Sequence, residues 1–598
     1  MLNWILVVIA RKHSNVSDIP QDSCRNPAYF VHGGPSCITG RSLESIELGG
    51  PGVLVAAGVD CGNISDKFFA ARTAGRAPER RARDHLFTRH TADIKFVTAD
   101  GVEFKVHSVI LSEASPLWES MFRLPQPSDA EGETSSDIPS IEVTEDSVTI
   151  NNLLSMCYPM QRPVLYDLDE VRDTLKAAIK YDVPHVITLL KEWALSFLRA
   201  APLRVYDLAC YNDCEDIALQ AARVVLSNSS QLGARFPMLY KRDMEHLTAG
   251  CYERLLGYCK AGGRVDDKYR FCSPQPDQYA ATENHEGAEN EENLSNFLRP
   301  HAYDMAAADV VLRSSDSVEF EVHRLVMAAS SPVFRDMLSP SSGRPADAGP
   351  VQLSVPACVV SPFLKLCYGQ LSDEIVLHDV REALLLYATA QKYQVPSARV
   401  DAQVDALIDR DPLRAYFAAY CYELEAQANC AARKLFGREL VPGTWCPEME
   451  TAPALAYHRL FRFLQACGEN AARLTNDVRW LPALCALRIN SRCVDKRQPA
   501  PSDPDARPWT GAVPTCWWTP LMREHMKKRL TAGLDIRMDR GMVRTSLDRL
   551  EHDQRLCSPC TESPAMIMGD IIEVLRCFYK AVDEAVQEVK CMFPLVPP

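Results

Sequence analysis

The sequence predicts an α+β protein that contains the same folding unit twice. The hexapeptide VEFKVH at residues 102–107 returns as VEFEVH at 318–323, and the flanking residues match at the same offset of 216. In each copy, short alternations of apolar and polar residues come before longer stretches with helical spacing. The duplicated unit runs from about residue 85 to 260, and again from about 304 to 470.

Each unit is expected to begin with a small cluster of strands. Asp93 to Val97 alternates with the period of two that is typical of a strand. Asp100-Gly101 supplies the backbone conformation of a tight hairpin, and the return strand places Phe104 and Val106 on one face. The segment SIEVTED at 140–146 predicts a third strand.

Helices are expected to follow the strands. Ser115-Pro116 is typical of a helix start, because serine caps the first turn and proline fits its first position. From Leu168 the apolar residues recur with helical spacing. That helix should end before Pro184, since the residue preceding a proline disfavours the helical conformation.

Composition shifts along the chain predict seven segments. Residues 277–292 hold six acidic side chains and no lysine or arginine, so they cannot pack a core and indicate a flexible linker. The expected segments are an irregular N-terminal part (1–84), a first domain (85–200) with a helical extension (201–262), an acidic flexible linker (263–303), a second domain (304–410) with its extension (411–470), and a helical, cysteine-containing C-terminal region (471–598).

Bulk properties exclude several classes of protein. The net charge of −13 argues against a protein that binds nucleic acid directly, because phosphate binding needs concentrated lysine and arginine. The apolar run from Trp4 to Ala10 is much shorter than a membrane span of roughly 20 residues, so we expect no membrane association. The 22 cysteines are too sparse for a disulfide scaffold and indicate free thiols. We therefore expect an intracellular protein, cytoplasmic or nuclear.

No constellation of residues predicts catalysis or cofactor binding. The chain has no phosphate-binding P-loop, and HGGP at 32–35 is not accompanied by a Gly-x-Ser-x-Gly nucleophile motif. Cys557 and Cys560 have the spacing of a zinc hairpin, with possible partners at Cys485, Cys493, Cys516 and His552. A structural zinc site normally takes two closely spaced pairs of ligands, and here only one such pair exists. We predict no catalytic residues, no cofactor and no metal, with these thiols packed against their neighbours.

The repeated segments resemble the BTB/POZ domain, a protein-interaction module. The resemblance rests on ADIKFVTADGVEFKVHSVILSEASPLWESMF at 92–122 and ADVVLRSSDSVEFEVHRLVMAASSPVFRDML at 308–338. The later helices resemble the extension that often follows such domains, so the resemblance covers about three fifths of the chain. The architecture is also similar to BTB proteins of basidiomycete fungi.

The resemblance implies a set of fold and interface residues, namely Asp93, Phe104 and His107 in the first unit and Asp309, Phe320, His323 and Arg324 in the second. In repressor members of the family, a buried aspartate pairs with a basic residue after the histidine, which Asp309 and Arg324 preserve. The first unit has Ser108 at that position, so we expect Asp93 to cap a helix or bind backbone instead. His107 and His323 are expected to be structural.

The family implies an interaction scaffold rather than an enzyme. We expect protein partners, and either an internal pseudo-dimer or a homodimer through the BTB faces. The alternative is a substrate adaptor of a cullin-type ubiquitin ligase or a transcription-linked regulator.

Overall fold

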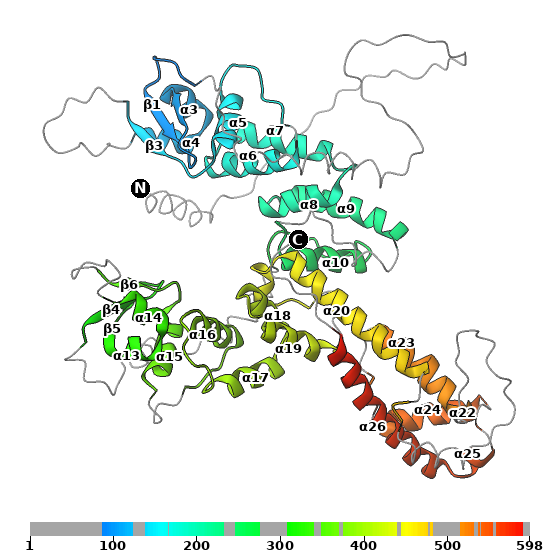
Figure 1. The fold of residues 1–598 in the computed structure, drawn as a ribbon. Helices are drawn as coiled ribbons and strands as arrows, with labels where there is room; N and C mark the ends of the chain where they lie inside the picture. Colours follow the sequence, from blue (N-terminus) through cyan, green and yellow to red (C-terminus); the bar gives the residue numbers. More distant parts are fainter. Residues whose placement is uncertain are drawn as a thin grey trace, which may run out of the picture. The chain divides into compact units, whose positions relative to one another are not determined.

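A computed structural model shows two copies of the predicted unit, followed by a helical C-terminal region (Figure 1). It describes residues 87–123, 138–165, 167–232, 246–274, 308–339, 349–369, 375–438, 444–476, 479–481, 515–531, 536–538, 540–553, 556 and 558–589. The expected N-terminal segment 1–84 and most of the acidic linker lie outside the described residues. We call residues 87–274 the first repeat and residues 308–476 the second repeat.

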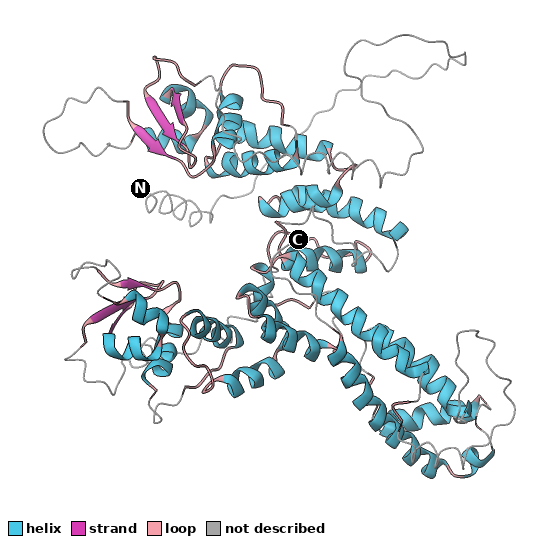
Figure 2. Ribbon diagram, viewed as in Figure 1, coloured by secondary structure: helices cyan, strands magenta, loops and turns pink. Residues whose placement is uncertain are grey.

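Each repeat begins with a three-stranded sheet (Figure 2). In the first repeat, β1 (Ile94–Val97) pairs antiparallel with β2 (Glu103–Val106) and parallel with β3 (Ser140–Glu142). The second repeat has the same order and directions in β4 (Val310–Arg313), β5 (Glu319–Val322) and β6 (Val351–Gln352). The alternation read from the sequence is therefore a strand pattern in both copies.

Helices flank each sheet in the predicted order. The first repeat has α3 (Ser108–Ala114), α4 (Pro116–Phe122), α5 (Ser147–Cys157), α6 (Leu168–Lys180) and α7 (Pro184–Ser196). The second repeat has α13 (Arg324–Ser330), α14 (Pro332–Met337), α15 (Ala357–Tyr368), α16 (Val380–Lys392) and α17 (Asp401–Arg410). Ser115 caps α4 by accepting a hydrogen bond from the Trp118 N–H, as its sequence predicts.

The hairpins of the two sheets form the same turn with different residues. Gly101 has a φ of 77°, and the equivalent Ser317 has a φ of 66°, in the left-handed region that favours glycine. The aspartate before each of them accepts a hydrogen bond from the start of a later helix, since Asp100 binds Ser147 N at 2.9 Å and Asp316 binds Ala357 N at 3.0 Å. Each hairpin is thus tied to the helix that follows the third strand.

Both sheets cover an aromatic core. Trp118 stacks on Tyr181 with ring centroids 5.3 Å apart, and Phe334 stacks on Tyr393 at 4.6 Å. The buried residues of the second sheet and its helices form a separate hydrophobic cluster. The core of the first sheet and its helices is instead continuous with the cluster that contains both extensions and the C-terminal helices.

Further helices extend each repeat. They are α8 (Pro202–Tyr211), α9 (Glu215–Leu232) and α10 (Ala249–Lys260) in the first extension, and α18 (Pro412–Cys421), α19 (Glu425–Leu435), the short helix η5 (Pro447–Glu450) and α20 (Ala454–Arg473) in the second. Buried residues of both extensions belong to one continuous hydrophobic cluster.

The C-terminal region is helical and packs on α20. Its elements are η6 (Leu474–Asn476), α22 (Thr515–Trp518), η7 (Thr519–Met526), α23 (Lys527–Thr531), α24 (Arg540–His552), α25 (Ser558–Glu562) and α26 (Pro564–Glu588). On α20, a Cβ at Gly468 would lie 2.3 Å from the Leu530 carbonyl oxygen, so only glycine allows α23 this close. Asn470 donates a hydrogen bond to the Ala585 carbonyl of α26 at 2.9 Å.

The observed architecture confirms the predicted α+β fold class with two small sheets, helical extensions and a helical C-terminal region. Among the described helices, none combines the length and the apolar character that a membrane crossing requires.

Candidate functional site

The signature residues of the first repeat hold the end of β2 to the start of α3. Asp93 accepts hydrogen bonds from the Ser108 N–H at 2.7 Å and from the Ser108 hydroxyl. Burial raises the pKa of Asp93, but these bonds outweigh it and lower the pKa below its usual value. His107 donates its backbone N–H to the Tyr158 hydroxyl at 2.7 Å, and its ring lies within hydrogen-bonding distance of Thr91 and Tyr158. These are the contacts of a structural histidine and of a carboxylate that binds backbone.

The second repeat reproduces this arrangement with an added ion pair. The Arg324 Nε donates to Asp309 at 3.1 Å, and the Arg324 backbone N–H donates to the same carboxylate at 2.7 Å. This backbone bond is the main cause of the lowered pKa of Asp309. His323 again contacts a tyrosine hydroxyl, that of Tyr368.

The expectation of a buried Asp309–Arg324 pair is wrong. Each side chain is about half exposed, so the pair lies at the surface. The physical reason is the position of Arg324, which is the first residue of a short helix at the domain surface. Its Nη1 donates a hydrogen bond to the Leu338 carbonyl. The remaining two signature residues, Phe104 and Phe320, are buried core residues at equivalent positions of β2 and β5.

An apolar side chain projects from the first turn of the same helix in each repeat. Val109 of α3 is 72% exposed, and the equivalent Leu325 of α13 is 81% exposed. Large apolar side chains that are scattered singly over a surface need no explanation, but here the same position is apolar and uncovered in both copies.

Comparison with known families agrees with this geometry. Residues 84–196 and 302–406 match the family model of the BTB/POZ domain. The chain carries two BTB/POZ domains. BTB domains are protein-interaction modules, so the two copies are interaction domains. No curated protein matches the chain, and the similarity to fungal BTB proteins stays a prediction.

The extensions that follow the two BTB domains contact each other through equivalent residues. Thr248 and Pro453 form an isolated antiparallel bridge just before α10 and α20. The Ala249 N–H donates to the Ala452 carbonyl at 2.7 Å, and the Ala454 N–H donates to the Leu247 carbonyl at 2.7 Å. Exchanging the two repeats converts one hydrogen bond into the other, so a local pseudo-twofold axis passes through the bridge.

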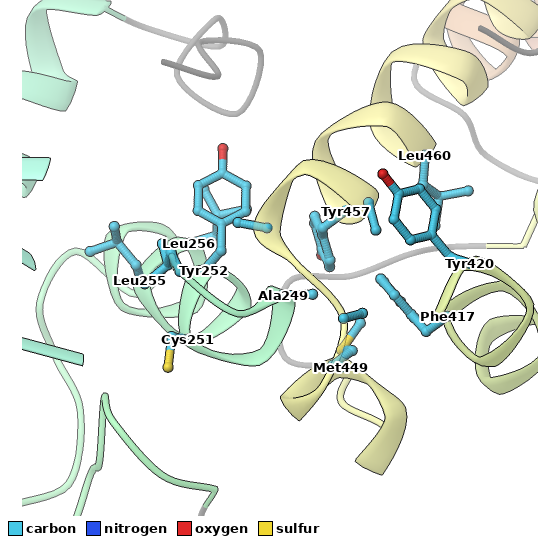
Figure 3. Close-up of a cluster of buried hydrophobic side chains, with 14 of the residues drawn as sticks. Ala249, Cys251, Tyr252, Leu255, Leu256, Phe417, Tyr420, Met449, Tyr457 and Leu460 are labelled. Atoms are coloured by element: carbon cyan, nitrogen blue, oxygen red, sulfur yellow. The ribbon is translucent and has the colours of Figure 1, made fainter. Parts of the chain in front are cut away.

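Aromatic side chains continue this symmetric contact (Figure 3). Tyr252 and Tyr457 are equivalent in the two repeats, and their rings meet edge to face with centroids 5.9 Å apart. On the other side Tyr457 stacks on Phe417 of α18 at 6.1 Å. Each extension also uses a tyrosine to tie its first helix to its last, since Tyr206 donates to the Cys251 carbonyl and Tyr416 to the Ala456 carbonyl.

A buried ion pair also crosses between the extensions. Arg254 of α10 donates two hydrogen bonds to Glu450 of η5, at 2.6 and 3.0 Å, although its side chain is only 2% exposed. Burial disfavours the charged guanidinium, but the bonds to Glu450 outweigh this and raise the pKa of Arg254. Trp445 donates a third hydrogen bond to the Glu450 carboxylate at 2.6 Å. This network fixes one extension against the other.

Sequence reasoning found the equivalence of the two extensions but missed their contact. METAPALAYHRL at 449–460 recurs as MEHLTAGCYERL at 244–255, and these two segments contain every residue of the bridge, but the recurrence by itself does not place them in contact. The expected internal pairing was through the BTB faces, and that pairing stays a prediction.

The cysteines considered for zinc do not form a metal site within the described residues. Cys516 and Cys560 are buried, with their sulfur atoms 3.6 Å apart, while His552 is exposed. Cys557, Cys485 and Cys493 lie outside the described residues.

In the described part of the chain, a different group, Asp213, Glu215 and Cys272, has metal-ligand proximity. Its Glu215 carboxylate already accepts the backbone N–H groups of Phe271 and Cys272. The carboxylate therefore serves to fix the segment after α10.

Proposed function

We propose that this chain is a non-enzymatic interaction scaffold whose two BTB domains bind protein through the first turns of α3 and α13. The observation that supports this most directly is the pair of equivalent exposed side chains, Val109 and Leu325. An uncovered apolar residue at the same place in both repeats suits a surface that is buried on association.

The occupant we favour is the matching face of a second copy of this chain. A twofold interface brings the same patch of both subunits together, so an apolar patch with few charges is complementary to itself. Stable interfaces bury on the order of 1,000 Å² or more, which requires more than one side chain from each face. The partly buried Leu117, Met121 and Phe122 belong to α4, which packs against α3, and they would border such a contact.

The extensions supply the platform for this binding. Their buried ion pair and aromatic contacts hold the two extensions against each other. Two binding faces on one platform raise the effective concentration of the second contact once the first has formed, so paired BTB domains would bind a partner with two matching faces more tightly than one domain alone.

Light scattering of the full-length protein over a wide range of concentrations tests the proposal. The wild type is expected to reach a two-chain mass, and the double variant Val109→Glu/Leu325→Glu is expected to remain at a one-chain mass, because a charge cannot be buried in an apolar interface without a large cost. A matched control is Val164→Glu, since Val164 is also apolar and 61% exposed but lies outside α3 and α13. This control should keep the wild-type mass.

Two results would overturn the self-association. A wild type that stays at one chain at every concentration would favour a heterologous partner, as in a ubiquitin-ligase adaptor or a transcription-linked regulator. A two-chain mass that survives in the double variant would place the interface elsewhere on the chain.

A further inference from the structure

Three thiols of the first extension gather where α8 and α10 meet the segment after α10. Cys210 lies near the end of α8, Cys251 lies in the first turn of α10, and Cys272 follows Phe271. The Cys210 sulfur atom lies 4.0 Å from the Phe271 carbonyl oxygen, and its main interaction partners include both other cysteines. The backbone encloses the group, with Cys251 Sγ 3.5 Å from the Cys272 carbonyl oxygen and Cys272 Sγ 3.7 Å from that of Ala209.

Cys251 lies in surroundings that favour its thiolate. The Nη2 of Arg254, one helical turn further along α10, is 3.3 Å from its sulfur atom. Its backbone N–H donates to the hydroxyl of Thr248, which caps the helix, and a helix N-terminus stabilises an anionic sulfur. The hydrogen bond from Cys210 is the largest influence, and together with Arg254 it outweighs burial and lowers the pKa of Cys251 to about 7.

Other cysteines of the same extension lack this activation. Cys259 lies on the same helix, but burial raises its pKa to about 11. Burial likewise raises the pKa of Cys214 to about 11. Because the thiolate is the reactive form of cysteine, Cys251 is the thiol of this group that is prepared to react near neutral pH.

The packing of the extension does not demand this arrangement. The second repeat has Tyr420 and Ala456 at the positions of Cys210 and Cys251, and its helices adopt the same arrangement. There the equivalent arginine, Arg459, donates a hydrogen bond to the Tyr420 hydroxyl at 2.9 Å. The first repeat thus places two thiols where the second has a tyrosine and an alanine, which cannot form a disulfide.

We propose that Cys251 and Cys210 form a peroxide-sensitive dithiol that closes to a reversible disulfide. The Cys251 thiolate attacks one oxygen of hydrogen peroxide, the O–O bond breaks, and the products are a Cys251 sulfenic acid and hydroxide. The Cys210 sulfur then attacks the Cys251 sulfur, and an S–S bond forms as the sulfenic oxygen leaves. The two thiol protons end in water, so two thiols and one peroxide give one disulfide and two waters.

The contact between the repeats lies next to this dithiol. Arg254 contacts both the Cys251 sulfur and the Glu450 carboxylate of the second repeat. A disulfide would remove the negative charge of the thiolate from one side of Arg254 and would link α8 to α10 covalently. The oxidation state of the first extension is thereby connected to the ion pair that joins the extensions.

Peptide mapping of the full-length protein tests the proposal. The reduced protein is treated with hydrogen peroxide, its free thiols are alkylated, and it is digested without a reductant. Mass spectrometry of the wild type is expected to find a peptide that links Cys210 to Cys251 and that disappears after treatment with dithiothreitol. The control Cys259→Ser should retain this link.

Two variants separate the steps. Cys251→Ala, which copies Ala456 of the second repeat and so preserves the packing, should lose the link and leave Cys210 reduced. Cys210→Ser should accumulate a sulfenic acid at Cys251, which dimedone traps. The proposal fails if Cys251 stays alkylatable in the peroxide-treated wild type while exposed cysteines oxidise. It also fails if Cys210 oxidises at the same rate in Cys251→Ala.

Discussion

Tyr252 and Tyr457 occupy equivalent positions in the two repeats, and their buried rings meet edge to face at a local pseudo-twofold axis. In an ordinary homodimer such a contact would join two identical residues of two chains. Here the duplication places both halves in one chain, so the pairing does not depend on protein concentration.

A double-mutant cycle on this pair should show direct coupling. Each single change, Tyr252→Ala or Tyr457→Ala, is expected to lower the free energy of unfolding by about 3–5 kcal/mol, as for other large buried aromatic residues. The coupling energy should be about 0.5–1.5 kcal/mol, measured by urea denaturation of the four proteins. Tyr258, also buried on α10, packs on Phe271 instead. A cycle between Tyr258 and Tyr457 should therefore be additive, and equal coupling in both cycles would contradict a direct contact.

Removal of Glu450 should destabilise the protein strongly. Glu450→Ala leaves the buried guanidinium of Arg254 without its carboxylate, and such a change typically costs about 3–5 kcal/mol. Glu319→Ala is a suitable control because the Arg313–Glu319 pair is exposed, so its loss should cost only about 0–1 kcal/mol. Urea denaturation of both variants measures the difference. Similar small losses would show that Arg254 finds another partner or reaches water.

Asp207 of α8 should make stability fall as pH rises. Its side chain is buried, its Oδ1 has no hydrogen-bond partner, and burial raises its pKa to about 7. The unfolded carboxyl titrates near pH 4, so between about pH 4 and 7 the folded state holds a proton that the unfolded state loses. Each step up in pH through that window therefore weakens the fold.

Replacing this carboxyl removes the effect. Asp207→Asn should stabilise the protein relative to wild type by about 2 kcal/mol more at pH 8 than at pH 5, as measured by urea denaturation at both values. The equivalent residue of the second repeat is Phe417, which is buried and uncharged. A stability difference between variant and wild type that does not change with pH would show that Asp207 titrates normally.

The two hairpins should respond oppositely to exchange of their turn residues. Gly101→Ala meets no neighbouring atom, so its cost of about 1 kcal/mol would come from the left-handed backbone alone. Ser317→Gly relieves the same strain, and we expect it to be neutral or to stabilise by about 0.5 kcal/mol, since glycine also loosens the unfolded chain. Thermal denaturation of both variants tests this. A clear loss of stability in Ser317→Gly would mean that its side chain makes a contact worth more than the strain.

Much of each BTB domain could be predicted because its signals are local. The cap at Ser115-Pro116 involves only the four residues up to Trp118, and the alternation that indicates a strand involves only the five residues from Asp93 to Val97. The resemblance to the BTB/POZ domain also implied that Asp309 and Arg324 are partners. They did not show that the pair is exposed, because burial depends on what the rest of the domain places over a residue.

The contact between the extensions could not be predicted in this way. The repeat shows that Tyr252 and Tyr457 are equivalent, but equivalence does not establish that they touch. An arginine is also a poor predictor of burial, since most arginines are exposed. Arg254 is buried because Glu450, almost two hundred residues later, returns to neutralise it. Such a pairing is visible only when both repeats are folded against each other.

The 20-residue helix α20 serves two neighbours along its length. Its first turn carries the bridge to the first extension, and its last turns carry Gly468 and Asn470, which hold α23 and α26. A helix of this length spans about 30 Å. A protein that binds the C-terminal helices and shifts them would therefore also shift α20, and with it the junction of the two repeats.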